Sequence, residues 1–255
     1  MNSIERFTGR AETYNRYRLR YPAALILDRL KTWCNLQPDW PIADIGAGTG
    51  MLSEVFLPNR NPVIAIEPNE EMRTTCAELR TRWPLLQVHD ATAEATGLPD
   101  NSVAIVAAGR AFHWFEIPRA LVEFERILHP NGWLVLVSLG RAKNENPQSH
   151  DFEQLLTTHG TDYASHVRAG YRVHENLDQI FAADRHHEEI PGEQIADWES
   201  FLGQTLSLSV TPQPANPRFP AFNQDLRNHF HTYAVDGQLS IPTTCWIDAG
   251  RITKP

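Results

Sequence analysis

The chain has 255 residues, of which 42% are hydrophobic and 21% charged, so it is long enough for one domain with a substantial core. Its 23 basic and 31 acidic residues give a net charge of −8, which argues against a general electrostatic grip on nucleic acid. Three scattered cysteines, no apolar leader and no apolar run long enough to cross a bilayer predict a cytoplasmic protein without a disulfide framework or a membrane span.

Short apolar runs alternate with helical patterns over the first 140 residues. A helical stripe begins behind Pro22, where proline is tolerated in a first turn. Further helices are expected over 69–82 and 117–128, and strands at 42–45, 63–67, 86–88, 103–107 and 133–138. The last strand is entered through Asn131-Gly132, a turn signal. Strands that are apolar throughout and alternate with helices indicate an α/β fold with a parallel sheet covered on both faces.

The pattern changes after Leu139. Residues 140–150 are polar and predict a loop, and the prolines between 212 and 220 predict irregular structure. Helical stripes follow at 152–156, 177–181, 198–205 and 222–233, and strands are expected at 186–190 and 243–252. We interpret this half as the end of the same sheet, carrying a helical insertion at about 191–238.

A glycine-rich turn follows the first strand and reads Asp44-Ile45-Gly46-Ala47-Gly48-Thr49-Gly50. Glycine allows the backbone to turn tightly and a ligand to approach the main chain. Because open α/β sheets bind ligands at the carboxyl ends of their strands, a nucleotide-like ligand is expected here. The alternatives to ligand binding are that the glycines form an ordinary strand-to-helix turn and that Asp44 only caps this turn.

The spacing of this turn bears on which nucleotide binds. A dinucleotide fingerprint places its third glycine at position 51, but this chain has Met51 there and a glycine at Gly50 instead. Glu67 ends the second strand, where an acid accepts hydrogen bonds from ribose hydroxyls. Glu67 alone does not separate a dinucleotide from S-adenosylmethionine. The glycine spacing and Asp44, which would repel a pyrophosphate, favour S-adenosylmethionine.

At this point the sequence resembles the class I S-adenosylmethionine-dependent methyltransferases. Besides the glycine turn and Glu67, the opening from Phe7 to Pro22 is similar to an F-x-x-x-A-x-x-Y-x-x-x-R-x-x-Y-P pattern of a small-molecule branch. Residues 93–102, 111–115 and 126–132 resemble later motifs of that branch, which includes the trans-aconitate and ubiquinone/menaquinone-type enzymes. The resemblance is strong over about residues 5–138 and weaker beyond.

The resemblance implies a Rossmann-like seven-stranded mixed sheet of order 3-2-1-4-5-7-6, with strand 7 antiparallel, helices on both faces and a helical insertion near the C-terminal strands. It implies a single domain over residues 1–255. Within it we expect an N-terminal cover over 1–30, a cofactor-binding core over 31–140, a substrate-side region with the insertion over 141–240, and a final strand over 241–255.

The resemblance also implies a set of cofactor-binding residues. Asp44, Gly46 and Gly48 would face the methionine part of S-adenosylmethionine, and Glu67 would bind the ribose. The adenine would pack on Met72 and meet Ala93 and Glu94 at its edge. Gly109 would lie beside the reacting methyl group, and Arg18 or Tyr14 would close over the site and meet the methionine carboxylate.

Three residues near the fourth strand are candidates for the acceptor side. Arg110 would select an anionic substrate if it faces the site, or would point into solvent. His113 is a candidate general base, although a histidine packed among Phe112, Trp114 and Phe115 is the commoner arrangement. Trp114 is interpreted as a wall of the pocket that shapes it or attracts the sulfonium. No catalytic residue is otherwise assigned.

The function expected from these features is methyl transfer from S-adenosylmethionine to a small-molecule acceptor by in-line displacement. Its alternatives are a methyltransferase-like module that binds the cofactor or a partner without turnover and, less favoured, a nicotinamide-dependent oxidoreductase. The histidines at 186, 187, 229 and 231 lack a completing ligand set, so no metal is expected. The acceptor, its reacting atom, any general base and the oligomeric state are not specified by the sequence.

Overall fold

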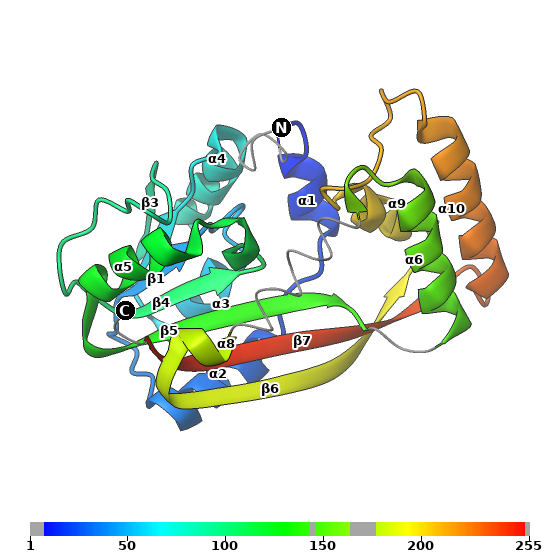
Figure 1. Ribbon diagram of the computed structural model, residues 1–255. Coiled ribbons are helices and arrows are strands. Elements are labelled where there is room, and N and C mark those ends of the chain that lie inside the picture. Colours follow the sequence, from blue (N-terminus) through cyan, green and yellow to red (C-terminus); the bar gives the residue numbers. More distant parts are fainter. Residues whose placement is uncertain (1–7, 143–145, 164–176, 253–255) are drawn as a thin grey trace.

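The computed structural model of the chain describes residues 8–142, 146–163 and 177–252. They form a seven-stranded sheet of order β3-β2-β1-β4-β5-β7-β6 in which β7 is antiparallel to both β5 and β6, so the predicted topology is confirmed (Figure 1). The strands are β1 (Ile42–Ile45), β2 (Val63–Ile66), β3 (Leu86–His89), β4 (Val103–Gly109), β5 (Leu128–Arg141), β6 (Phe181–Ala196) and β7 (Leu239–Ile252).

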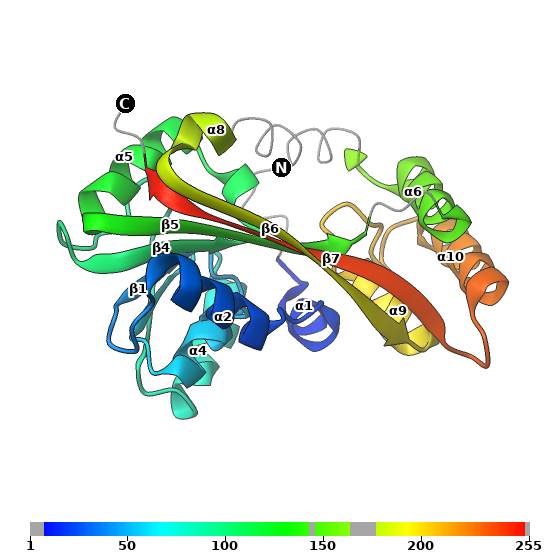
Figure 2. The same ribbon diagram turned by 90° about the horizontal axis from the view of Figure 1, so that it is seen from below.

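The helices fall into three groups around this sheet. One face is covered by α2 (Ala23–Cys34), α3 (Ser53–Phe56) and α4 (Glu70–Glu78), and the other by α5 (Ile117–Ile127) and α8 (Leu177–Ile180) (Figure 2). Beyond the body of the sheet, α6 (Pro147–His159), α9 (Trp198–Leu206) and α10 (Phe219–Tyr233) pack on the far ends of β6 and β7. The first helix, α1 (Ala11–Tyr17), lies between α4 and α9.

The core follows the predicted periodicity. β1 is buried at all four positions and β4 at its first six, as expected for central parallel strands with both faces covered. In α2, Ile26 and Leu30 are fully buried on the stripe that faces the sheet. The side chain of Asn69 caps α4 by accepting a hydrogen bond from the amide of Met72 at 3.0 Å.

The C-terminal strands are longer than predicted. β6 continues to Ala196, so the helical insertion begins near residue 197 and the predicted start at 191 is wrong. Most of β6 is exposed or half-exposed, so its sequence lacks the apolar alternation that would show where the strand ends. Pro191 does not end the strand, because an edge strand tolerates proline. Likewise, residues 140–150 are not all loop, because β5 runs to Arg141 and α6 begins at Pro147.

The Asn131-Gly132 signal lies within β5 as the structure assigns it. Asn131 has a φ of +67°, and the pairing of β4 with β5 shifts from Val103↔Leu128 to Ile105↔Trp133. The register therefore advances by five positions along β5 but by only two along β4, which is an irregularity of the strand.

Candidate functional site

Two neighbouring cavities open at the carboxyl ends of the central strands. The smaller, of about 410 Å³, is lined by the glycine turn after β1, the end of β2, α4 and the segment after β3. The larger, of about 1410 Å³, lies between the ends of β4, β5 and β7 and the helices α6 and α9. Four of the described residues line both cavities, namely Tyr14, Arg110, Ala111 and Trp114. A group held in one cavity therefore lies next to a group held in the other.

The three glycines of the turn have left-handed φ angles but serve different purposes. A Cβ on Gly46 would stand 2.7 Å from the Cβ of Ala111, and one on Gly50 would stand 2.6 Å from a methyl of Leu79, so both permit close packing. A Cβ on Gly48 would meet nothing within 4 Å, because Gly48 faces the smaller cavity. The turn thus presents bare backbone to a ligand at Gly48.

Met51 occupies the place where a dinucleotide fingerprint would have its third glycine. Its side chain is buried in the core on the α2 face of the sheet. Close packing of the turn against α4 is instead provided by Gly50. The observed geometry therefore uses the G-x-G-x-G spacing of this chain.

Asp44 is fully buried beneath the turn. One carboxylate oxygen accepts a hydrogen bond from the Ser53 hydroxyl at 2.6 Å, and the other has no hydrogen-bond partner in the described part of the chain. Burial raises the pKa of Asp44 to about 7, although the hydrogen bonds from Ser53 oppose the rise. The described residues that line the two cavities do not include Asp44, so its predicted contact with the cofactor stays a prediction.

Glu67 lies at the end of β2 and lines the smaller cavity. Its two carboxylate oxygens accept hydrogen bonds from the amides of Gly48 and Asn69, both at 2.8 Å. Burial raises the pKa of Glu67 against these hydrogen bonds. A carboxylate has about four acceptor positions, so roughly two remain for hydroxyl groups of a ligand. The spacing that predicted Glu67 therefore places an acceptor beside the bare backbone of Gly48.

The other predicted cofactor residues surround the same cavity. Met72 is 3% exposed on α4, and Ala93 and Glu94 lie across from it in the segment after β3. One carboxylate oxygen of Glu94 accepts a hydrogen bond from the amide of Glu116 at 2.8 Å. These three residues and Glu67 line one cavity, and their contacts with a cofactor stay predictions.

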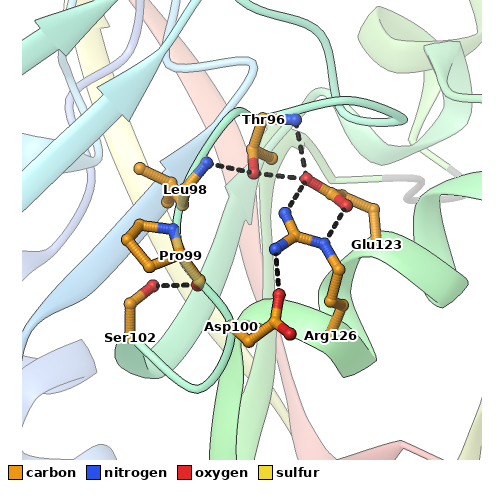
Figure 3. A network of polar contacts seen from close by, with 7 residues as sticks. All are labelled: Thr96, Leu98, Pro99, Asp100, Ser102, Glu123 and Arg126. Carbon is orange, nitrogen blue, oxygen red and sulfur yellow. Dashed lines mark hydrogen bonds and ion pairs between the residues drawn. The ribbon is translucent and has the colours of Figure 1, made fainter.

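A polar network holds that segment against α5 (Figure 3). Glu123 on α5 accepts hydrogen bonds from the amide and the hydroxyl of Thr96, at 2.8 and 2.5 Å. Arg126 donates to both oxygens of Glu123 and also to Asp100. The hydrogen bonds from Arg126 lower the pKa of Glu123 to about 2 against partial burial. The network holds Thr96 in place and with it the chain at Glu94, two positions earlier in the sequence. None of the sequence patterns predicts this network.

Arg110 faces the site rather than solvent. It follows Gly109 at the end of β4 with a φ of +56°, and its guanidinium donates to the hydroxyl of Tyr21 at 3.1 Å and the carbonyl of Leu19 at 3.2 Å. Its Nη1 is buried and has no hydrogen-bond partner among the described residues. A Cβ on Gly109 would stand 2.7 Å from the hydroxyl of Tyr21, so the absence of a side chain there leaves room for Tyr21.

The N-terminal segment contributes to both cavities. Tyr14 on α1 lines both of them, and Arg18 lines the larger one. Burial alone would raise the pKa of Tyr14, but the guanidinium groups of Arg110 and Arg18 outweigh it and lower that pKa. The Nε of Arg18 is buried without a partner in the described regions. Phe7, which began the opening pattern, lies outside the described residues.

Contacts with the insertion hold α1 in this position. The Tyr17 hydroxyl donates to Glu199 on α9 at 2.6 Å, and Arg10 donates to the carbonyl of Leu206 at 3.2 Å. A Cβ on Gly203 would stand 2.3 Å from the Tyr17 ring, so the bare backbone of α9 at Gly203 allows the ring to lie against it. The N-terminal segment and the insertion are therefore held together at the larger cavity, which residues of both line.

His113 and Trp114 lie in a short 3-10 helix after β4. His113 lines the larger cavity, and its ring lies 4.8 Å from that of Trp114 between centroids. Phe112 and Phe115 pack edge to face nearby, at 5.8 Å between centroids. His113 is thus both packed among aromatic rings and adjacent to the cavity, and its role as a base stays a prediction.

The larger cavity also contains a carboxylate–imidazole pair that the sequence did not predict, although His187 was considered there as a metal ligand. His187 Nδ1 lies 2.8 Å from an oxygen of Asp248, and Asp248 is 2% exposed. Both residues line the cavity, together with Arg141 at the end of β5. They come from β5, β6 and β7, so only the antiparallel pairing of the sheet brings them together, and no local pattern signals it.

In the described ranges, no three histidine, cysteine, aspartate or glutamate side chains gather in a way that would hold a metal ion. The three cysteines of the chain, Cys34, Cys76 and Cys245, are buried and unbridged. No helix within the described ranges is both long and apolar enough to span a membrane.

The sequence over residues 43–136 matches the family model of a methyltransferase domain. An uncharacterized methyltransferase of Mycobacterium tuberculosis is 34% identical over 131 residues, which is 51% of each protein, so the match spans about half of that relative. An uncharacterized methyltransferase-like protein of Schizosaccharomyces pombe is 35% identical over 221 residues, covering 68% of this chain and 83% of the relative.

Solved structures share the fold. A protein of Anaeromyxobacter dehalogenans named "Putative Type II Methyltransferase" superposes with a TM-score of 0.65 at 25% identity, covering 94% of this chain and 100% of that one. Phosphoethanolamine N-methyltransferase 2 of Haemonchus contortus, solved with S-adenosyl-L-methionine, superposes with a TM-score of 0.54 at 11% identity. The superposition covers 99% of this chain and 61% of that enzyme, and at this identity the similarity concerns the fold alone.

Proposed function

Since this chain belongs to the S-adenosylmethionine-dependent methyltransferase family, we propose that it transfers the methyl group of S-adenosylmethionine to a small-molecule acceptor. The observation that carries the proposal is the pair of cavities that share Tyr14, Arg110, Ala111 and Trp114. The smaller one suits the cofactor and the larger one the acceptor. Methyl transfer needs two reactants held side by side and aligned, and this arrangement provides adjacent sites.

The residues of the smaller cavity suit an adenosyl ligand. Gly48 leaves room for the ligand at the backbone, where any Cβ would project into the cavity. Glu67 would accept hydrogen bonds from the ribose hydroxyls. Met72 would pack against the adenine face, with Ala93 and Glu94 at its edge. Bound S-adenosylmethionine supplies an electrophilic methyl group on a positively charged sulfur.

The remaining residues would position the reactants and exclude water. Arg18 and Tyr14 are suited to the methionine carboxylate, because the guanidinium of Arg18 has an unused donor. Trp114 forms part of the wall between the two cavities, near the end of β4. An acceptor carboxylate needs no base, whereas a phenol or thiol must lose a proton, for which His113 is the candidate. Most of the rate would then come from alignment and water exclusion.

Calorimetry with S-adenosylhomocysteine, followed by transfer of a labelled methyl group to a panel of acceptors, tests this function. Glu67→Gln is expected to weaken binding about 10- to 100-fold, because charge-assisted hydrogen bonds to the ribose are lost. Glu78→Gln, on the exposed side of α4, is the matched control and should bind normally. Failure of the folded wild type to bind would refute the proposal, and binding without transfer to any acceptor would favour a non-catalytic module. A titration with NAD(H) should show no binding.

A further inference from the structure

The far end of the larger cavity contains an arginine that has no hydrogen-bond or ion-pair partner among the described residues. The Arg141 guanidinium carbon lies 3.7 Å from the ring centre of Phe152 on α6 and 5.0 Å from that of Phe201 on α9. Within the described part of the chain, the guanidinium makes no hydrogen bond or ion pair. Its aromatic contacts hold it in place but leave its N–H donors unused.

The charge of Arg141 is only partly solvated, because the side chain is half-buried in the wall of the cavity. Desolvation lowers the pKa of Arg141 to about 9, which still leaves the side chain protonated at neutral pH. A half-buried charge without a counter-charge is unfavourable, and stacking on aromatic rings offsets only part of the cost. An anion bound at this end of the cavity would remove most of that cost.

The acids of the cavity do not supply that anion. Asp151 accepts a hydrogen bond from Tyr233, and Glu153 accepts one from Tyr163 at 3.3 Å. Asp248 is paired with His187 at 2.8 Å, and Glu189 lies 3.7 Å from the other ring nitrogen of His187. Among the described residues, no carboxylate forms an ion pair with Arg141.

Arg141 is also remote from the place proposed for the methyl donor. Gly109, at the open end of β4, pairs with Val137, and Arg141 lies four residues further along β5. At about 3.3 Å per residue, this is roughly 13 Å along the strand. Arg141 does not line the smaller cavity, which is the one proposed for the cofactor, so it is not needed there.

We propose that Arg141 binds an anionic group, a carboxylate or a phosphate, of the methyl acceptor. The proposal rests on the proposed function and narrows its acceptor to elongated anions whose charged group lies away from the methylated atom. A guanidinium recognises both kinds of anion through paired N–H donors, so it orients the acceptor as well as attracting it. Arg141 is thus a specificity-determining residue at the end of the cavity opposite the reacting methyl.

Calorimetry on the protein loaded with S-adenosylhomocysteine tests the proposal with three probes: phenylacetate, phenyl phosphate and the neutral phenylacetamide. The wild type is expected to bind at least one anion about tenfold more tightly than the amide. Arg141→Gln should weaken that anion about 10- to 100-fold and leave the amide and S-adenosylhomocysteine unchanged. Arg82→Gln is the matched control, because Arg82 also lies over an aromatic ring, that of Trp83, but is exposed and lines neither cavity.

A second measurement separates ligand binding from a structural role. Arg141→Met replaces a half-buried charge, which has no counter-charge among the described residues, by an apolar chain. The ligand-free variant is therefore expected to melt at the same temperature as the wild type or about 2–4 °C higher. A lower melting temperature together with weaker S-adenosylhomocysteine binding would make Arg141 structural and overturn the proposal, as would failure of both variants to fold. A wild type that binds S-adenosylhomocysteine but does not prefer anions also overturns it. Absence of S-adenosylhomocysteine binding refutes the proposed function instead.

Discussion

Replacing Asp44 by asparagine tests the burial of the carboxyl beneath the glycine turn. Its pKa is raised from 3.8 to about 7 in the folded protein, so the folded state binds this proton more tightly than the unfolded state. The stabilisation that results is complete below about pH 4 and is lost as the pH rises through 7. The difference of about 3 units corresponds to about 4 kcal/mol at 1.36 kcal/mol per unit.

Asp44→Asn should therefore match the wild type in stability at pH 4 and exceed it by up to about 4 kcal/mol at pH 8. An asparagine at this position can still accept the hydrogen bond from Ser53, as the neutral carboxyl does. Urea unfolding of both proteins at intervals from pH 4 to pH 8.5 gives the difference directly, because the other titrating groups are common to both and cancel. Asp39→Asn, at an exposed position, controls for the loss of one carboxylate.

A difference between variant and wild type that stays constant from pH 4 to pH 8.5 would refute this reasoning, as would a variant that is less stable at pH 8. Either result would mean that Asp44 is charged and stabilised in the folded protein. The second would point to a favourable partner for its unpaired oxygen.

Three further substitutions have defined outcomes. Gly48→Ala places a Cβ in the smaller cavity and should raise the Kd for S-adenosylhomocysteine at least about tenfold by calorimetry, whereas Gly237→Ala, which has the same backbone strain elsewhere, should not. Glu123→Gln removes the counter-charge of Arg126 and should lower the free energy of unfolding in urea by about 1–3 kcal/mol at pH 7. The difference from the wild type should be smallest below pH 2, because the stabilisation by the Glu123 carboxylate is lost as the pH falls from about 4 through 2. An unchanged free energy of unfolding at pH 7 would contradict this. Gly203→Ala forces the Tyr17 ring away from α9 and should lower the free energy of unfolding by about 1–3 kcal/mol, and a stability equal to that of the wild type would show that α1 does not need this contact.

The first half of the fold was accessible from the sequence because its signals are local. β1 and β4 are apolar runs bounded by turns, and Asp44, Gly46 and Glu67 lie at fixed distances along the chain. Each of these features is set by a few consecutive residues. The order of the sheet came from the family resemblance rather than from the periodicity, which indicated only a covered parallel sheet.

The second half carries weaker signals. β6 lies at the edge of the sheet and is largely exposed, so its sequence has no apolar alternation that would mark its ends. Arg141 looks like an ordinary polar residue in the sequence, since its aromatic neighbours come from α6 and α9. His187 meets Asp248 across 61 residues of chain. Such long-range contacts form the wall of the larger cavity and have no counterpart in local spacing.

The position of Tyr14 in the wall between the two cavities has a thermodynamic consequence. A ligand that orders this ring on one side changes the surface offered to a ligand on the other, so the two affinities are linked. Linkage is mutual, and whatever factor the donor applies to the affinity of the acceptor, the acceptor applies to that of the donor. The hydrogen bond from Tyr17 to Glu199 joins α1 to α9. A movement of Tyr14 on α1 would therefore also be felt by α9, which lines the larger cavity. Filling one cavity therefore changes the affinity of the other by the same factor, whichever is filled first.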